Sequence, residues 1–387
     1  MLEVADIFRA AGPAYRDKFG SRMLPSHRAA MWAIEQCRTE ALGGHVAVCD
    51  HCREETYHYH SCRNRHCPRC QADQTSRWVA SRRSLLLPCP YYLVTLTLPS
   101  ELRPLARSHQ REVYSVLLCE AAASVMKLVA DSKWVGARPG ILAVLHTWTQ
   151  AMSYHPHAHL LVTAGGWNEP EQCWVKPAHE RFLLSGRVLS AIFRAKMKCA
   201  LYASGLYASV PASAWERERA WVTHCQPAGD GERVLDYLGR YVHRIAITNR
   251  RLEHFADGKV TFTFRDRKTK RIERCTVSDE EFIRRFLQHV LPQGFTKVRY
   301  YGIFSASSSA QREHARAILT LAAANASTQK PAVAQAAGSL GRESPTDATA
   351  STSLTESVEG GDDALCPSCR IGRLRRIAIP RKKWKPP

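Results

Sequence analysis

The stretch ILAVLHTWTQAMSYHPHAHLLVTAGG (141–166) decides the fold, because it contains two apolar runs separated by a short turn. ILAVLHTW (141–148) and YHPHAHLLVTAG (154–165) are rich in aliphatic and aromatic residues, which predicts two neighbouring β-strands. Alternate side chains of a strand share a face, so His155, His157 and His159 are expected to point the same way. Packing alone rarely explains three imidazoles on one face, and they indicate a metal site.

The segments around these strands predict an α+β fold, in which an antiparallel sheet is backed by helices. Ser278, with Glu281 three residues later, forms a capping box that is expected to open a helix over 279–291. Further helices are expected within 1–45 and over 101–131, 186–203 and 232–243. Further strands are expected over 91–98, 244–248, 259–266, 271–278 and 298–305.

The segment CDHCREETYHYHSCRNRHCPRC (49–70) predicts a zinc site. Its pairs Cys49-x-x-Cys52 and Cys67-x-x-Cys70 are separated by fourteen residues, close to the spacing of a four-thiolate zinc ribbon. Cys62 and His66 also lie inside the segment, so a mixed ligand set or a second ion remains open. Buried free thiols are the plainer alternative.

The same region is basic, and the whole chain of 387 residues carries a formal net charge of +20. Such a charge favours a polyanionic partner, either nucleic acid or an acidic membrane. Near the cysteines, aromatic residues are interleaved with basic ones, which suits phosphate contacts and base stacking, although a solvated charged face is the alternative. The arginines expected to contact DNA are Arg63, Arg65, Arg69 and Arg77.

Composition also bounds the location and the ends of the chain. No apolar run approaches the roughly 20 residues that span a bilayer, and the N-terminus lacks the order of a secretory signal, which predicts a soluble intracellular protein. In a reducing compartment the 14 cysteines are expected to be thiols or metal ligands. Residues 306–362 are rich in Ala, Ser, Thr and Gln and predict a disordered linker.

Beyond the linker, Cys366-x-x-Cys369 and a basic tail complete the chain. No Cys or His follows this pair, so it supplies only half of a site. Three interpretations stay open: the pair completes its coordination elsewhere in the chain, dimerises around an ion, or binds nothing.

A pair of tyrosines is the last candidate feature. Tyr237 and Tyr241 in RVLDYLGRYVHRIAI (233–247) are four residues apart, so a helix places them on one face, one turn from each other. Such a pair alone is more often part of a core or an interface. The neighbouring Arg233, Arg240 and Arg244, together with the histidine strand, favour a functional role.

Taken together, HPHAHLLVTAGG and YLGRY resemble the HUH nucleases, and specifically the two-tyrosine rolling-circle transposases of the IS91 type. CDHC and SCRNRHCPRCQ are similar to the zinc-binding domain of those transposases. The resemblance implies an RRM- or ferredoxin-like antiparallel sheet with helices on one face, behind a small zinc-binding domain. The expected divisions are a helical and zinc-binding domain (1–86), a catalytic domain (87–305), the linker (306–362) and the tail (363–387).

Carried over by position, the resemblance implies that His157 and His159 bind a catalytic Mg²⁺ or Mn²⁺. Gln150 is the first candidate for a third ligand, and His155 and His146 are the others. The implied nucleophiles are Tyr237 and Tyr241, with Arg240 or Arg244 stabilising the developing negative charge.

The implied reaction is cleavage and joining of single-stranded DNA at transposon ends and targets, through a 5′-phosphotyrosine link and a free 3′-OH. One phosphodiester replaces another, so no ATP is needed, in agreement with the lack of a G-x-x-x-x-G-K-[ST] loop. The resemblance further implies a bacterial cytoplasmic protein at the nucleoid, with structural Zn²⁺ and no membrane partner.

Two other functions fit parts of the sequence. A non-enzymatic zinc-ribbon protein would bind nucleic acid through 45–72 and the basic tail. A metal-dependent phosphodiesterase would activate water and would need carboxylates near the metal. Asp236 lies in the tyrosine helix, but the sequence has no carboxylate cluster beside the histidine strand.

Overall fold

The structure is a computed structural model that describes the chain except for residues 180–182, 217–220, 243–245, 267–268, 329–363 and 383–387. Its residues group into two compact units. The first contains Met1–Cys37 and Ser61–Ala323, and the second contains Arg38–His60 with the described residues of Ala324–Lys385. The second unit therefore joins segments that are far apart in the sequence.

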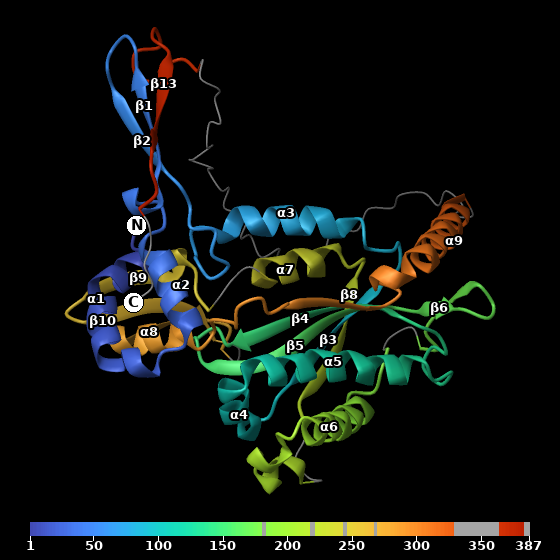
Figure 1. Cartoon of the computed structure of the whole chain (residues 1–387). Helices are drawn as coiled ribbons and strands as arrows, with labels where there is room; N and C mark the ends of the chain where they lie inside the picture. Colours follow the sequence, from blue (N-terminus) through green and yellow to red (C-terminus); the bar gives the residue numbers. More distant parts are fainter. Residues whose placement is uncertain (180–182, 217–220, 243–245, 267–268, 329–363, 383–387) are drawn as a thin grey trace. The chain divides into compact units, whose positions relative to one another are not determined.

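The first unit is built on a five-stranded antiparallel sheet between layers of helices (Figure 1). All nine residues of its strand β4 are buried, which explains why ILAVLHTW is a continuous apolar run. The strands predicted over 91–98, 141–148, 154–165 and 298–305 are confirmed. In spatial order the strands are β12 (Val298–Gly302), β4 (Gly140–Trp148), β5 (Tyr154–Thr163), β3 (Tyr91–Thr97) and β8 (Thr223–Gly229).

One face of this sheet is covered by helices α4 (Arg103–Ser108), α5 (Gln110–Val129) and α6 (Gly186–Ala203). Val94 and Leu160 on the sheet share a buried core with Leu117 of α5 and Phe193 of α6. The apolar residues of α6 recur at helical spacing, and Leu189, Phe193, Met197 and Leu201 form its buried stripe.

The opposite face is covered by helices α3 (Gln71–Arg83), α7 (Glu232–Val242) and α9 (Ser309–Thr328) (Figure 1). Leu235 and Leu238 of α7 share a core with Val144 and Leu161 of the sheet. The α+β class and its antiparallel sheet are thus confirmed, but the helices, expected on one face, cover both. The physical reason is that both parities of the central strands are apolar, so each face needs a cover.

A smaller antiparallel sheet packs with the N-terminal helices. Strands β9 (Leu252–Ala256), β10 (Lys259–Arg265) and β11 (Ile272–Ser278) lie in the order β11-β10-β9. Phe262 of β10 shares a core with residues of helices α1 (Val4–Phe19), α2 (Pro25–Glu35) and α8 (Asp279–Leu287). The predicted cap of α8 is confirmed, because the Ser278 hydroxyl accepts a hydrogen bond from the Glu281 amide (3.2 Å). A hairpin of β6 (Gly166–Asn168) and β7 (Cys173–Val175) completes this unit's strands.

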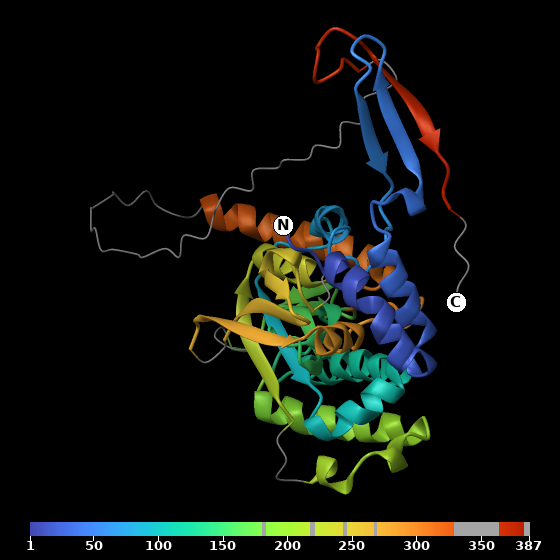
Figure 2. The ribbon, with the colours of Figure 1, turned by 90° about the vertical axis from the view of Figure 1, so that its left-hand side faces the viewer.

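The second unit contains a three-stranded antiparallel sheet in the order β13-β1-β2, and Figure 2 shows these strands running side by side. Strands β1 (Gly44–Cys49) and β2 (Glu55–Tyr59) form a hairpin. Strand β13 (Leu374–Ile379) adds to β1 in a register that pairs Gly44 with Ile379 and Cys49 with Leu374. The grouping of 38–60 with the tail departs from the division expected at residue 86, because β13 pairs directly with β1.

Three local expectations are corrected. Residues 309–328, expected within the linker, form α9, because the segment is rich in Ala, the strongest helix former; the remainder, 329–362, lies outside the described residues. Strand β8 was missed because its sequence THCQPAG contains Pro and Gly and few β-branched residues. Residues 246–248, expected in a strand, have no strand structure.

Candidate functional site

Three histidines converge on the sheet face that α7 covers. His146 lies on β4 directly opposite His157 of β5, and His159 is two residues further along β5. Opposite residues and residues two apart share a face of a sheet, so this register brings all three rings together. All three are buried, and one ring nitrogen from each lies within 4.8 Å of the others.

Hydrogen bonds orient two of these rings. The Nδ1 of His157 donates to the carbonyl oxygen of His155 (2.6 Å), which can only accept, so the proton lies on Nδ1 and the lone pair lies on Nε2. The Nδ1 of His159 lies 2.9 Å from the Thr95 hydroxyl, which can accept in the same way. Histidines that bind metals are oriented by such contacts. These two rings therefore suit coordination through Nε2.

The candidates for a third ligand lie in different places. His146 joins the cluster of His157 and His159. Gln150 lines the same pocket as the three histidines. The Nδ1 of His155 lies 3.0 Å from the guanidinium of Arg103, which can only donate, so this nitrogen is occupied. Sequence reasoning placed Gln150 before His146 as the candidate third ligand. Residue spacing alone does not reveal that β4 pairs with β5 in a register that sets His146 opposite His157.

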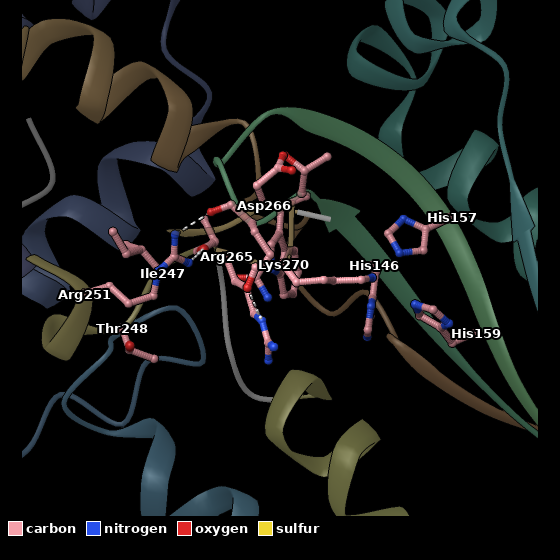
Figure 3. A pocket seen from close by; sticks show the side chains of 13 residues that line it. His146, His157, His159, Ile247, Thr248, Arg251, Arg265, Asp266 and Lys270 are labelled. Carbon is pink, nitrogen blue, oxygen red and sulfur yellow. Dashed lines mark hydrogen bonds between the residues drawn. The ribbon is translucent and has the colours of Figure 1, made fainter. Parts of the chain in front are cut away.

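The histidines line a pocket of about 490 Å³. Figure 3 shows them on one side, with Ile247, Thr248 and Arg251 on the other and Arg265, Asp266 and Lys270 between. Arg251 is fixed by hydrogen bonds to the carbonyl oxygens of Thr263 (2.7 Å) and Gln150. The lining thus holds three basic side chains, Arg251, Arg265 and Lys270, and one carboxylate, Asp266. Sequence reasoning did not find these four charged residues, because they lie roughly 100 residues after the histidines along the chain.

Helix α7 leads into this pocket. Its Leu235 and Leu238 pack on the sheet face that carries the histidines, and the chain reaches the pocket at Ala246, four residues after the helix ends. The backbone of Tyr237 and Tyr241 lies in α7, as predicted. The side chains of both tyrosines and of Arg240 lie outside what the structure describes, and so does the whole of Arg244.

Helix α3 packs closely along another flank of α7. A Cβ atom on Gly239 of α7 would lie 2.2 Å from a methyl carbon of Val79, so only glycine permits this approach. At the exposed end of the same contact, Arg83 forms an ion pair with Asp236 (3.4 Å). Gly239 lies between the two tyrosines in YLGRY, so this motif contains a packing residue as well as candidate nucleophiles.

The cysteines form two clusters, whereas the spacing favoured a single four-thiolate site and left a second ion open. Cys67 and Cys70 lie with Cys62 and with Cys37, which comes two residues after the end of α2. The Sγ atoms of Cys37 and Cys62 lie 3.6 and 3.7 Å from that of Cys70. Sequence reasoning missed Cys37 because it belongs to no C-x-x-C pair.

The other expected pair, Cys49 and Cys52, lies in the second unit with Cys366 and Cys369. One four-thiolate site from Cys49, Cys52, Cys67 and Cys70 is therefore corrected to two groups of four. A C-x-x-C knuckle specifies only two ligands, and the fold decides which other pair it meets.

His66 takes part in neither cluster. Its Nδ1 lies 3.1 Å from the Asn64 side-chain oxygen, and its Nε2 accepts a hydrogen bond from the Leu291 amide (3.2 Å). Burial lowers the pKa of His66 well below its ordinary value, so the ring is neutral. Its role is to join the cysteine segment to the loop after α8.

The arginines expected to contact DNA divide into two kinds. Arg65 donates to the Phe295 carbonyl (2.7 Å), and Arg69 forms an ion pair with Glu3 (3.0 Å) and donates to the Cys37 carbonyl. These two hold the cysteine cluster to the rest of its unit. Arg63 and Arg77 are exposed, so the prediction of DNA contact rests on them.

Known proteins resemble this chain over most of its length. A family described as "Transposase zinc-binding domain" matches residues 7–98, and one described as "Putative transposase" matches residues 140–312. "Putative transposase y4qJ" of Sinorhizobium fredii is 43% identical over 320 residues, which are 78% of this chain and 79% of that relative. The chain belongs to the IS91-type transposases.

A second relative of this transposase is "Transposase for insertion sequence element IS801" of Pseudomonas savastanoi pv. phaseolicola, 29% identical over 283 residues, or 70% of this chain and 68% of that protein. No solved structure matches the transposase. As a transposase it is a DNA-processing enzyme, and DNA is its partner. Within the described residues, no helix has the length and apolar character needed to cross a membrane.

The matched ranges can be compared with the sites. The histidines and the pocket wall lie inside the transposase match, and the cluster of Cys37, Cys62, Cys67 and Cys70 lies inside the zinc-binding match. The transposase therefore carries a zinc-binding domain. Cys366 and Cys369 lie outside both ranges.

Proposed function

We propose that this transposase nicks and joins single-stranded DNA by metal-assisted tyrosine transesterification, as an HUH nuclease that drives rolling-circle transposition. The observation that carries the proposal is the convergence of His146, His157 and His159 in a basic pocket to which α7 leads. The histidines alone would support only a metal site. The tyrosine helix alone would support only a packed helix.

The donor set fits a divalent ion. His146, His157 and His159 would hold it, and three ligands leave coordination positions open for substrate. A bound ion would act as a Lewis acid that draws charge from the scissile phosphate. Imidazole nitrogen suits transition metals better than Mg²⁺, which prefers oxygen ligands, so this set favours Mn²⁺ over Mg²⁺.

The chain's own residues would perform the transfer. The hydroxyl oxygen of Tyr237 or Tyr241 attacks the phosphorus, forming a Tyr–O–P bond to the 5′ side while the bond to the 3′ oxygen breaks. The tyrosine loses its proton, and the 3′ oxygen gains one and leaves as a hydroxyl. The phosphodiester count is unchanged, so no nucleotide cofactor is consumed. A second tyrosine one turn away would cut a second strand while the first remains loaded.

The basic residues of the pocket would hold the DNA backbone. Arg251, Arg265 and Lys270 line the pocket against one carboxylate, Asp266, and this excess of positive charge attracts phosphates. Basic groups placed beside a reacting phosphate also stabilise the charge that develops in the transition state. These residues would stabilise negative charge in the same way as the resemblance implies for Arg240 or Arg244.

The structural metal of the zinc-binding domain is proposed at Cys37, Cys62, Cys67 and Cys70. Two pairs of Sγ atoms are 3.6 and 3.7 Å apart, close to the roughly 3.8 Å expected for thiolates around a tetrahedral zinc with bonds of about 2.3 Å. These separations are far above the roughly 2 Å of a disulfide. Zinc there would fix the segment that carries Arg63 and begins α3.

The test is a suicide single-stranded oligonucleotide that contains a transposon end and traps the covalent intermediate. The wild type should form a protein–DNA adduct in the presence of Mn²⁺, and so should the control Tyr202→Phe, whose exposed side chain lies on α6. The double variant Tyr237→Phe, Tyr241→Phe should form none. An adduct in that variant would overturn the assignment of the nucleophiles.

The metal role is tested separately. His157→Ala with His159→Ala should abolish cleavage while DNA binding is largely retained, because the zinc domain and the exposed arginines are unchanged. Cleavage at the wild-type rate would overturn the role of the histidines.

Asp266 favours a second candidate function, a hydrolase that activates water. It places a carboxylate in the histidine pocket, which the sequence had not indicated. This enzyme would still cleave in the double tyrosine variant, would form no adduct, and would lose activity in Asp266→Asn. The same oligonucleotide assay therefore separates the two candidates.

A further inference from the structure

The two ends of the chain meet in a second group of four cysteines. Cys49 and Cys52 come from the β1–β2 hairpin, and Cys366 and Cys369 precede β13. The Sγ atoms of Cys49 and Cys369 are 3.6 Å apart, and those of Cys52 and Cys366 are 3.7 Å apart. All four Sγ atoms lie within 4.8 Å of one another, the arrangement expected of ligands around one tetrahedral zinc.

The two pairs have the same local structure. Each is followed by an arginine in the left-handed region, Arg53 (φ 61°) and Arg370 (φ 58°), whose amide donates to the carbonyl of the first cysteine of its pair. A backbone amide also donates to a thiol sulfur in each: Cys52 to Cys49, and Gly372 to Cys369, both at 3.4 Å. Such bonds stabilise a thiolate. Both turns are thus knuckles that aim two sulfurs at one point.

The knuckles fit closely against each other. A Cβ atom on Gly372 would lie 2.6 Å from the Cys49 Sγ and 2.5 Å from the Asp50 carboxylate, so only glycine allows this approach. The Asp50 amide donates to the Arg373 carbonyl (3.1 Å), and the Arg373 amide donates back to the Asp50 carboxylate (2.8 Å). The pairing of β1 with β13 continues directly from this contact.

The second unit has little else to stabilise it. Among its described residues, the buried apolar side chains besides Cys49 and Cys366 are Leu42 and Ala47, and none belongs to the three hydrophobic cores. A small sheet with so little core usually needs a metal or a disulfide to fold. The sulfur separations do not fit disulfides, whereas they fit the ligands of one metal ion.

We propose that Cys49, Cys52, Cys366 and Cys369 bind a second structural zinc ion that fastens the C-terminal segment to the β1–β2 hairpin. This ion links residues 320 positions apart and makes the strand β13 part of the fold. It answers the question that the half-site Cys366-x-x-Cys369 left open: its other half is in the same chain. The proposal does not depend on the catalytic mechanism.

The first experiment counts zinc in the purified full-length protein by mass spectrometry of the metal. Cys366→Ser with Cys369→Ser should lose one zinc per chain relative to the wild type. Cys49→Ser with Cys52→Ser should lose the same single zinc, and the variant with all four changes should lose no more. The control Cys173→Ser with Cys199→Ser, outside both clusters, should lose none. Unchanged zinc in the C-terminal variant, or additive losses, would overturn the proposal.

A second experiment needs no substitution and is informative even if the variants misfold. The wild type is treated with N-ethylmaleimide before and after zinc chelation, and each cysteine is followed by peptide mass spectrometry. The exposed Cys52 and half-buried Cys369 should react only after chelation. Cys119 and Cys199, which are also exposed, should react in both states. Equal reactivity of Cys52 before and after chelation would overturn the proposal.

Discussion

The hydroxyl of Thr95 gives the sharpest test of the histidine site. It lies on β3 directly opposite His159 and 2.9 Å from the Nδ1 of that ring. Thr95→Val keeps the shape of the side chain and removes only the acceptor. The His159 Nδ1 then loses its hydrogen bond to this hydroxyl in a buried position, and the ring loses a contact that orients Nε2 toward the metal.

The magnitude follows from that one contact. Leaving a buried donor unsatisfied costs about 1–3 kcal/mol. Loss of an outer hydrogen bond to a metal-binding histidine typically weakens metal affinity about 10- to 100-fold, which is about 1.4–2.8 kcal/mol and agrees with that range. We therefore expect the Mn²⁺ concentration for half-maximal cleavage to rise about 10- to 100-fold. Cleavage at saturating Mn²⁺ should change little, because the ligand itself remains.

The assay is a Mn²⁺ titration of oligonucleotide cleavage, with direct Mn²⁺ binding followed by electron paramagnetic resonance. Thr97→Val is the matched control, because Thr97 lies on the same strand opposite His157, and within the described residues its hydroxyl bonds to no histidine. The reasoning is refuted if Thr95→Val binds Mn²⁺ as tightly as the wild type, or if Thr97→Val weakens binding equally.

Three further predictions concern other parts of the chain. Gly372→Ala should weaken zinc binding at the second cysteine cluster, because overpacking costs about 1–3 kcal/mol. The control Gly20→Ala, which has no atom within 4 Å of the added carbon, should bind zinc like the wild type. Equal retention of zinc by the two variants in competition with a chelator would contradict this prediction. Arg63→Ala and Arg77→Ala should each lower the slope of log DNA affinity against log salt concentration by about 0.7 and leave thermal stability unchanged. Arg69→Ala, which breaks the ion pair with Glu3, should lower thermal stability and change the slope little. The reverse pattern in binding and melting experiments would refute this division of the arginines. Burial lowers the pKa of His289 from 6.5 to about 3, so between these pH values the unfolded chain binds a proton at this residue and the folded chain does not. The free energy of unfolding should therefore fall by up to about 1.4 kcal/mol per pH unit between pH 6.5 and pH 3. Denaturant titrations should find a shallower fall in His289→Gln, and an unchanged dependence on pH would count against this role of His289.

Much of the local structure could be predicted because it depends on near neighbours. The strands around 141–165 follow from their apolar runs, the cap of α8 follows from Ser278 and Glu281, and the helix of Tyr237 and Tyr241 follows from periodicity. Strand β8 could not be predicted in this way, because pairing with β3 overrides its weak propensity. The same holds for α9, whose Arg316 donates to the carbonyls of Ser84 and Leu86, contacts that composition cannot reveal.

By itself the sequence determined the residue types and their short spacings. These are two histidines two apart on a strand, two tyrosines four apart on a helix, and three C-x-x-C pairs. Tertiary structure alone decided their partners. Strand register brings His146 to His157 and His159, the fold gives Cys67 and Cys70 the partners Cys37 and Cys62, and β13 carries Cys366 and Cys369 to Cys49 and Cys52. The physical reason is that a local pattern orients at most two or three ligands, whereas a closed coordination sphere needs more, and the others come from wherever the chain's packing brings them.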